Sequence, residues 1–90
     1  MVNVMKVVAK NIDMIAWFRE NGKIRPLKFK IGEEDHYQVI KVDRVIKGEI
    51  EKYAGNVMYV FDCQSEINGE VKPYQLKYEI ETNRWILFKI

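Results

Sequence analysis

The chain has 90 residues, of which 48% are hydrophobic and 31% are charged, and its net charge is +2. This composition is typical of one small globular domain over residues 1–90 and excludes a disordered or fibrous chain. The longest apolar runs, residues 14–18 and 57–61, exclude a membrane-spanning helix, which needs about 20 apolar residues.

The first segment of the chain has only a loose strand pattern. Apolar residues alternate weakly over residues 2–10, and Asn11 and Asp13 then interrupt them. We predict an edge strand or an extended arm over residues 1–13. The next run, residues 14–18, is short and rich in aromatic side chains, which favours a buried strand over a helix.

Two stretches of the sequence share one design. Asn21-Gly22 and Asn68-Gly69 each precede a segment in which apolar and polar residues alternate around a single proline. Asn-Gly favours the tight type I′ turn, because both residues adopt positive φ at low cost. The sequence therefore predicts two β-hairpins, one at each Asn-Gly pair.

The strand after the first turn changes phase at Pro26. Ile24 has an even number, whereas Leu27 and Phe29 have odd numbers, so these residues share a face only if one extra residue is inserted. Proline has no backbone donor and occurs at bulges, so we predict a bulge at Pro26. This bulge would bring four basic side chains to the solvent face. They are Lys23, Arg25, Lys28 and Lys30.

Residues 43–54 allow two interpretations. Apolar residues recur there at helical spacing, and Gly55 could end a helix. Gly48 in the interior and the β-branched residues before it count against a helix. We favour a strand that ends near Lys47, followed by a loop with at most one helical turn.

The rest of the chain completes a sheet of about six antiparallel strands. Such a sheet must curl to cover its apolar face, which gives a small barrel or a compact sandwich. We favour the barrel, because bulges bend strands at barrel corners. Further strands are predicted over residues 37–46, 57–67, 74–80 and 85–90.

Four spaced patterns of apolar and aromatic residues lie within residues 21–90. They are Pro26-x-x-Phe29, Tyr37-x-Val39-x-x-Val42, Tyr74-x-Leu76-x-Tyr78 and Trp85-x-Leu87-x-x-Ile90. Together they resemble a group of small bacterial β-rich domains of uncharacterised function. Some of those domains are attached to, or occur near, proteins related to the lesion-bypass DNA polymerases. The resemblance implies a shared β fold and carries over no catalytic residues.

Few residues have the chemistry of an active site. The single histidine, His36, lies in an acidic turn that lacks the fixed ligands of a zinc site. The single cysteine, Cys63, alternates with aromatic residues, which favours a buried thiol over a nucleophile. Ser65 has no nucleophile elbow, and the five glycines form no phosphate loop. We therefore expect no enzyme activity, no cofactor and no metal.

The cellular location is predicted from the first residues and from the cysteine count. No basic start is followed by an apolar block, so we expect no signal peptide. Cys63 has no second cysteine to pair with, which agrees with a reducing compartment. We expect a cytoplasmic protein without membrane partners.

Two binding functions of different classes fit this sequence. The first is a protein-interaction or self-association module, in which the apolar first residues add a strand to a partner or to a second copy. We rank it above weak single-stranded nucleic-acid binding, in which Trp17 stacks on a base. A competing interpretation places both Trp17 and Trp85 in the core. The residues expected to contact phosphates are Lys23, Arg25, Lys28 and Lys30.

Overall fold

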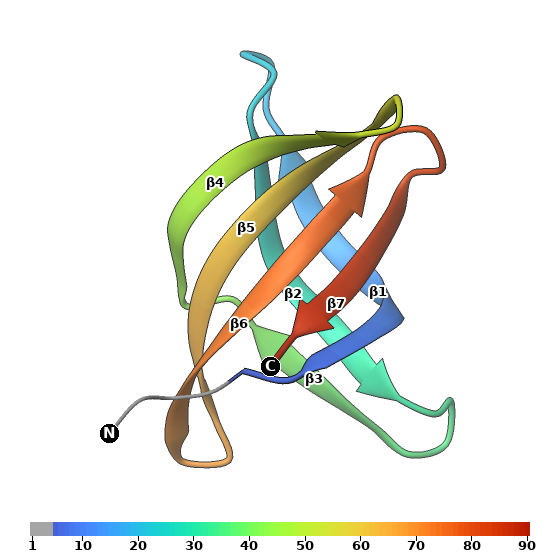
Figure 1. The fold of residues 1–90 in the computed structure, drawn as a ribbon. Helices are drawn as coiled ribbons and strands as arrows, with labels where there is room; N and C mark the ends of the chain where they lie inside the picture. Colours follow the sequence, from blue (N-terminus) through green and yellow to red (C-terminus); the bar gives the residue numbers. More distant parts are fainter. Residues whose placement is uncertain (1–4) are drawn as a thin grey trace.

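The computed structural model describes residues 5–90, which form seven β-strands (Figure 1). Every strand pair is antiparallel. Within these residues there is no helix long and apolar enough to cross a membrane. The strands are β1 (Val7–Phe18), β2 (Ile24–Gly32), β3 (Tyr37–Lys41), β4 (Arg44–Tyr53), β5 (Asn56–Ile67), β6 (Glu70–Glu79) and β7 (Arg84–Lys89).

All seven strands belong to one curled sheet with the order β3-β2-β1-β7-β6-β5-β4. The sheet curls until its two end strands, β3 and β4, meet at the short connection Val42-Asp43 (Figure 1). Away from this corner, a cleft separates the start of β2 from β4. The structure is thus an open barrel. It confirms the predicted all-β class, with seven strands instead of about six.

Strand β1 connects the two halves of the sheet. Residues 7–12 pair with β7, and residues 13–18 pair with β2. A bulge at Ala9, whose φ is +46°, bends the strand in its first half. Residues 7–12 of the segment predicted as an edge strand or extended arm over residues 1–13 are thus a strand that, among the described residues, pairs on one side, with β7. Residues 1–4 of that prediction lie outside the described residues.

The two Asn-Gly pairs form different turns. Asn68 and Gly69 have φ values of 52° and 82°, as the predicted type I′ turn requires. In the first hairpin only Gly22 has a positive φ, and its N–H donates to the carbonyl of Arg19 at 2.9 Å. This hairpin has a longer loop, built from a type I turn and a glycine bulge. Both predicted hairpins exist, but only the second has the predicted turn.

The predicted bulge in β2 exists, although its extra residue is Leu27 and not Pro26. On the facing strand, Ile15 pairs with Lys28 and Ala16 pairs with Pro26, so Leu27 has no partner. Pro26 is buried and Leu27 is exposed. The proline ring is apolar and rigid enough to fill the core, and the unpaired residue next to it turns outward.

Strand β4 runs to Tyr53, which corrects the predicted end near Lys47 and excludes the helix over residues 43–54. Its pairing with β5 continues to the last residue of the strand. The two strands are joined by a tight turn at Ala54-Gly55, both with positive φ. This turn lacks the Asn-Gly pair from which a hairpin would be predicted. The long-range pairing with β5 therefore overrides the weak local preference of this segment.

The core lies on the concave side of the curled sheet. Its aromatic rings are in contact, with 4.9 Å between the centroids of Tyr78 and Trp85 and 5.7 Å between those of Phe61 and Trp85. Burial of these rings and of the aliphatic residues around them is the main stabilising contribution to the fold. The core cluster is Phe29, Ile40, Val42, Phe61, Cys63, Ile67, Tyr74, Leu76, Tyr78, Trp85 and Leu87.

Candidate nucleic-acid interface

The convex side of β1, β2 and β3 combines exposed apolar side chains with basic ones. The pairing of the strands brings them together, since Trp17 lies opposite Arg25 and Ile15 lies opposite Lys28. We call this surface the convex basic face. It consists of Ile15, Trp17, Arg19, Arg25, Leu27, Lys28, Lys30, Tyr37, Val39 and Lys41.

Trp17 is the aromatic centre of this face. It is 52% exposed, whereas Trp85 is 7% exposed and belongs to the core, so the two tryptophans have different environments. Met14 and Ala16 on the same strand point inward, and the alternation of side chains therefore turns Trp17 outward. The guanidinium carbon of Arg19 lies 4.6 Å from the centroid of the indole ring, a cation–π contact.

The bulge at Leu27 determines which cations share the convex basic face. Arg25 and Lys28 are three residues apart and would point to opposite sides of a regular strand. The extra residue restores them to one side, where Lys30 follows at the next outward position. The bulge therefore produces the row of basic side chains that the sequence predicts for this strand.

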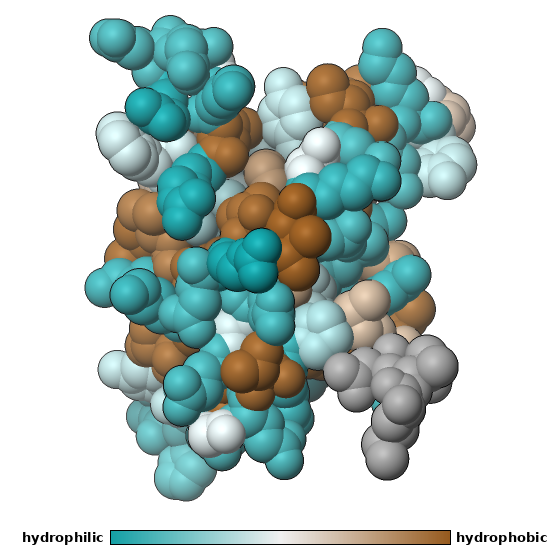
Figure 2. All heavy atoms as spheres, turned by 90° about the vertical axis from the view of Figure 1, so that its left-hand side faces the viewer, coloured by the Kyte–Doolittle hydropathy of each residue, from teal (hydrophilic) through white to brown (hydrophobic). Residues whose placement is uncertain are grey.

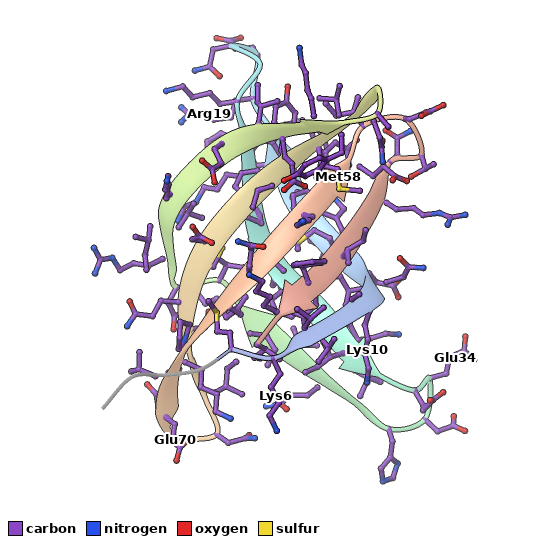
Figure 3. All side chains as sticks on the ribbon, in the orientation of Figure 1. Lys6, Lys10, Arg19, Glu34, Met58 and Glu70 are labelled. Atoms are coloured by element: carbon purple, nitrogen blue, oxygen red, sulfur yellow. The ribbon has the colours of Figure 1, made fainter. Side chains whose placement is uncertain are left out.

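The basic charge of this face is only partly compensated. Lys28 lies directly opposite Lys41 on β3, and like charges in this position destabilise a sheet. Lys30 lies 3.7 Å from the carboxylate of Asp13, which is the only ion pair of this face among the described residues. In Figure 3, Arg19 and the acidic turn around Glu34 lie near opposite ends of β2. An anionic ligand would relieve the repulsion between Lys28 and Lys41.

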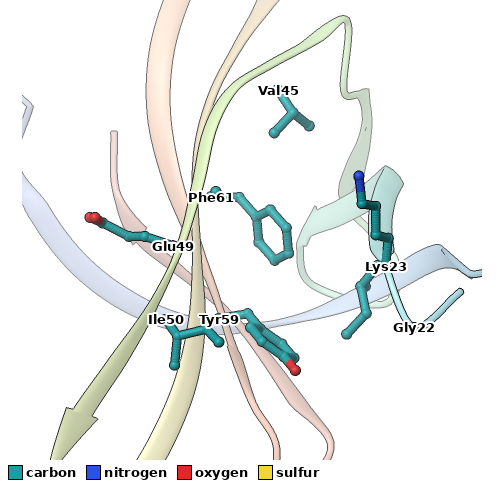
Figure 4. A pocket seen from close by; sticks show the side chains of 9 residues that line it. Gly22, Lys23, Val45, Glu49, Ile50, Tyr59 and Phe61 are labelled. Atoms are coloured by element: carbon teal, nitrogen blue, oxygen red, sulfur yellow. The ribbon is translucent and has the colours of Figure 1, made fainter.

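Lys23 is separated from the other predicted cations. It lies in the turn between β1 and β2 and lines a cleft of about 520 Å³ on the concave side (Figure 4). The walls of the cleft come from the start of β2 and from β4 and β5, including Ile50, Tyr59 and Phe61. The structure thus joins four of the five predicted binding residues on one face. They are Trp17, Arg25, Lys28 and Lys30.

Sequence reasoning missed Arg19 and Lys41 as members of this face. Arg19 follows directly after β1, and its contact with Trp17 depends on the conformation of the turn. Lys41 reaches the face through the pairing of β3 with β2. The periodicity of residues 37–41 was a usable signal, since it places Tyr37, Val39 and Lys41 on one side.

The side chains with reactive chemistry lie outside this face. Burial raises the pKa of the Cys63 thiol to about 12, and the nearby Asp62 carboxylate adds to this effect. The thiol is therefore protonated at neutral pH, as a buried structural cysteine would be. His36 lies in the exposed turn between β2 and β3, where its Nδ1 is 3.1 Å from the carbonyl oxygen of Asp35. No group of three metal-ligating side chains occurs within residues 5–90.

The chain was compared with known proteins at three levels. Neither the protein-family models, nor the curated proteins, nor the solved structures contain a match. The function is therefore inferred from the geometry of the chain itself.

Proposed function

We propose that this protein binds single-stranded nucleic acid on the convex basic face. The observation that carries the proposal is the exposed indole of Trp17 beside a row of cations with little compensating negative charge. Proteins that bind single strands without strong sequence preference combine these two features, a basic track for the backbone and aromatic rings for the bases.

Stacking on Trp17 would supply the contact with a base. Its ring is large and half exposed, and the second half of β1 holds it by pairing with β2, where Arg25 lies opposite. A base that stacks on an aromatic side chain contributes about 1–3 kcal/mol, whichever base it is. The Arg19 guanidinium already lies over the indole, so it could form one side of a stack that includes the base.

The cations of β2 and β3 would contact the phosphates. Alternate residues on a strand are roughly 6.7 Å apart, so Lys28 and Lys30 form an evenly spaced row. Lys41 adds a cation beside Lys28 on the neighbouring strand. Each phosphate that they neutralise releases counterions, which makes the binding sensitive to salt.

Single strands fit this face better than a duplex does. Trp17 needs the open face of a base, and the bases of a duplex are stacked on one another. Sequence readers of duplex DNA insert a helix or a two-stranded ribbon into the major groove. Here the cations lie on the convex outer side of a sheet rather than on a projecting element.

The proposal is tested by titrating the protein with a short single-stranded oligonucleotide of mixed sequence and following the backbone amide signals by NMR. We expect shifts along residues 15–19 and 25–30 that weaken as the salt concentration rises. Trp17→Ala should weaken binding roughly 5- to 150-fold, the equivalent of one stacked base. Lys28→Gln should reduce the slope of log K against log salt by about 0.7.

The matched control is Lys72→Gln, which removes the same charge from an exposed position on β6. It should leave the affinity nearly unchanged. Equal weakening by Lys72→Gln and Lys28→Gln would show attraction to net charge alone and would overturn the proposed face. Absence of any shift at low salt would overturn nucleic-acid binding altogether.

Association through the apolar first residues is the second candidate function. Its support is weaker, because residues 7–12 are already paired with β7 of the same chain. The edges of the sheet belong to other strands, β3 and β4. Any pairing with a second chain should therefore be sought there.

A further inference from the structure

Strand β4 is a long and accessible edge. It has ten residues, and within residues 5–90 it pairs only with β5, which leaves its other side without a neighbouring strand in that part of the chain. Ile46 and Ile50 are 55% and 60% exposed, although they are large and apolar. In Figure 2 the molecule is hollowed at its upper end, and β4 and the β1–β2 turn line a cleft. Exposed edges of this kind can pair with a strand of another chain.

Gly48 lies in the middle of β4, two residues after the bulge at Ile46, and neither its backbone conformation nor the space around it requires glycine. Its φ is not positive, so the backbone conformation suits other residues. A Cβ at this position would lie 3.7 Å from the Phe61 ring, which is an ordinary contact. Glycine weakens a strand interior, and it often marks a place where another backbone approaches closely.

The charged residues on the two sides of Gly48 would be complementary in a symmetric pair of β4 strands. In an antiparallel pair of identical strands with Gly48 on the twofold axis, Lys47 lies opposite Glu49 of the second copy, and the reverse pair forms on the other side. Ile46 precedes this regular segment at a bulge, because Val45 pairs with Cys63 and Lys47 pairs with Asp62 on β5. Within one chain Lys47 Nζ lies 3.5 Å from the Glu49 carboxylate. Both side chains are more than half exposed, so this weak surface ion pair can exchange for the two pairs across the axis.

Neighbouring registers are disfavoured by like charges. An axis at Lys47 or at Glu49 places that side chain against its own copy, and an axis at Ile50 pairs Glu49 with Glu51 twice. In the register centred on Gly48, the like-charged residues that come nearest are Arg44 and Lys52, and Arg44 lies beyond the bulge at Ile46. Both of these residues are exposed to solvent, which screens their repulsion.

We propose that two copies of this chain associate by antiparallel pairing of their β4 strands about Gly48. The pairing would join two sheets into one continuous sheet, with Lys47 of each strand in contact with Glu49 of the other across the axis. This inference is independent of nucleic-acid binding, because the convex basic face lies on β1, β2 and β3.

The test is a charge exchange, measured by sedimentation velocity without nucleic acid. Wild type should form dimers as its concentration rises. Lys47→Glu makes positions 47 and 49 both acidic, so that two carboxylates face each other across the axis, and Glu49→Lys makes both positions basic. The dimer dissociation constant of each single variant should therefore be about tenfold higher than that of the wild type. An equimolar mixture of the two variants should dimerise again, because opposite charges then meet across the axis.

The double variant Lys47→Glu/Glu49→Lys is the matched control, since it keeps the composition and should dimerise as the wild type does. Circular dichroism and thermal melting of each variant would confirm that it is folded. A wild type that stays monomeric at millimolar concentration would overturn the proposal. Failure of the mixture to recover association would overturn the Gly48 register, as would undiminished dimers of both single variants.

Discussion

The hydroxyl groups of Ser65 and Tyr74 meet in the core at the corner between β3 and β4. Ser65 donates its one proton to the carbonyl of Lys41 at 2.7 Å and accepts the N–H of Asp43 at 3.2 Å. Tyr74 is therefore the donor in its bond with Ser65. This buried serine connects β5 and β6 to the connection between β3 and β4, and so it holds the barrel closed at this corner.

Ser65→Ala should lower the free energy of unfolding by about 1–3 kcal/mol, because it removes the partner of the buried Tyr74 hydroxyl and of partly buried backbone groups of Lys41 and Asp43. Urea denaturation followed by circular dichroism measures the change. Tyr74→Phe is the control, since it removes only one of the three bonds and should cost about 0.5–1.5 kcal/mol. A serine variant no less stable than the phenylalanine variant would contradict the central role of Ser65.

Alkaline pH should destabilise the fold through Cys63 and Tyr74. Burial raises the pKa of the thiol from 9.0 to about 12 and that of the phenol from 10.0 to about 12. The folded state thus holds protons that the unfolded state releases, and stability falls as the pH rises from about 9 towards 12. The urea midpoint measured against pH should show this decline, and Cys63→Ala should flatten its first part. A decline equally steep in the variant would exclude Cys63 as its source.

The two tryptophans should respond differently to a quencher. Trp17 is 52% exposed and Trp85 is 7% exposed, so acrylamide should quench mainly the emission of Trp17. In Trp17→Phe the remaining emission should be blue-shifted and poorly quenched. The same variant should change the free energy of unfolding by no more than about 0.5 kcal/mol, as surface substitutions usually do. Strong quenching of the remaining tryptophan would contradict the buried position of Trp85.

Local patterns predicted the strands whose partners are their neighbours in sequence. Residues 57–67 and 74–80 alternate clearly around Asn68-Gly69, and they correspond to β5 and β6. The turn chemistry and the two-residue period are both local, so one sequence suffices to recognise them. The basic row on β2 was predicted for the same reason.

Pairing between distant segments could not be predicted in this way. The first half of β1 lies against β7 at the other end of the chain, and its own alternation is weak. The position of Lys41 opposite Lys28 likewise follows from the pairing of β3 with β2. Leu27 was assigned to the core because the sequence indicates a phase change without showing which residue is extra. The pairing register decides which residue is extra, and it therefore decides the face of each side chain next to the bulge.

Acid should weaken the fold through Glu79, at the end of β6. Its carboxylate accepts hydrogen bonds from Thr82 in the following turn and from Asn56 on β5, at 2.9 Å for the latter, and these bonds lower its pKa. A carboxyl group with a lower pKa in the folded state stabilises the fold above its unfolded pKa, which is about 4.3. That contribution disappears as the pH falls through the lower, folded value.

Glu79→Gln should therefore show a smaller drop in the urea midpoint between neutral and strongly acidic pH than wild type. Glu70→Gln, at the exposed start of the same strand, should keep the wild-type drop. Identical acid profiles for wild type and Glu79→Gln would show that these two hydrogen bonds do not couple the carboxylate to folding.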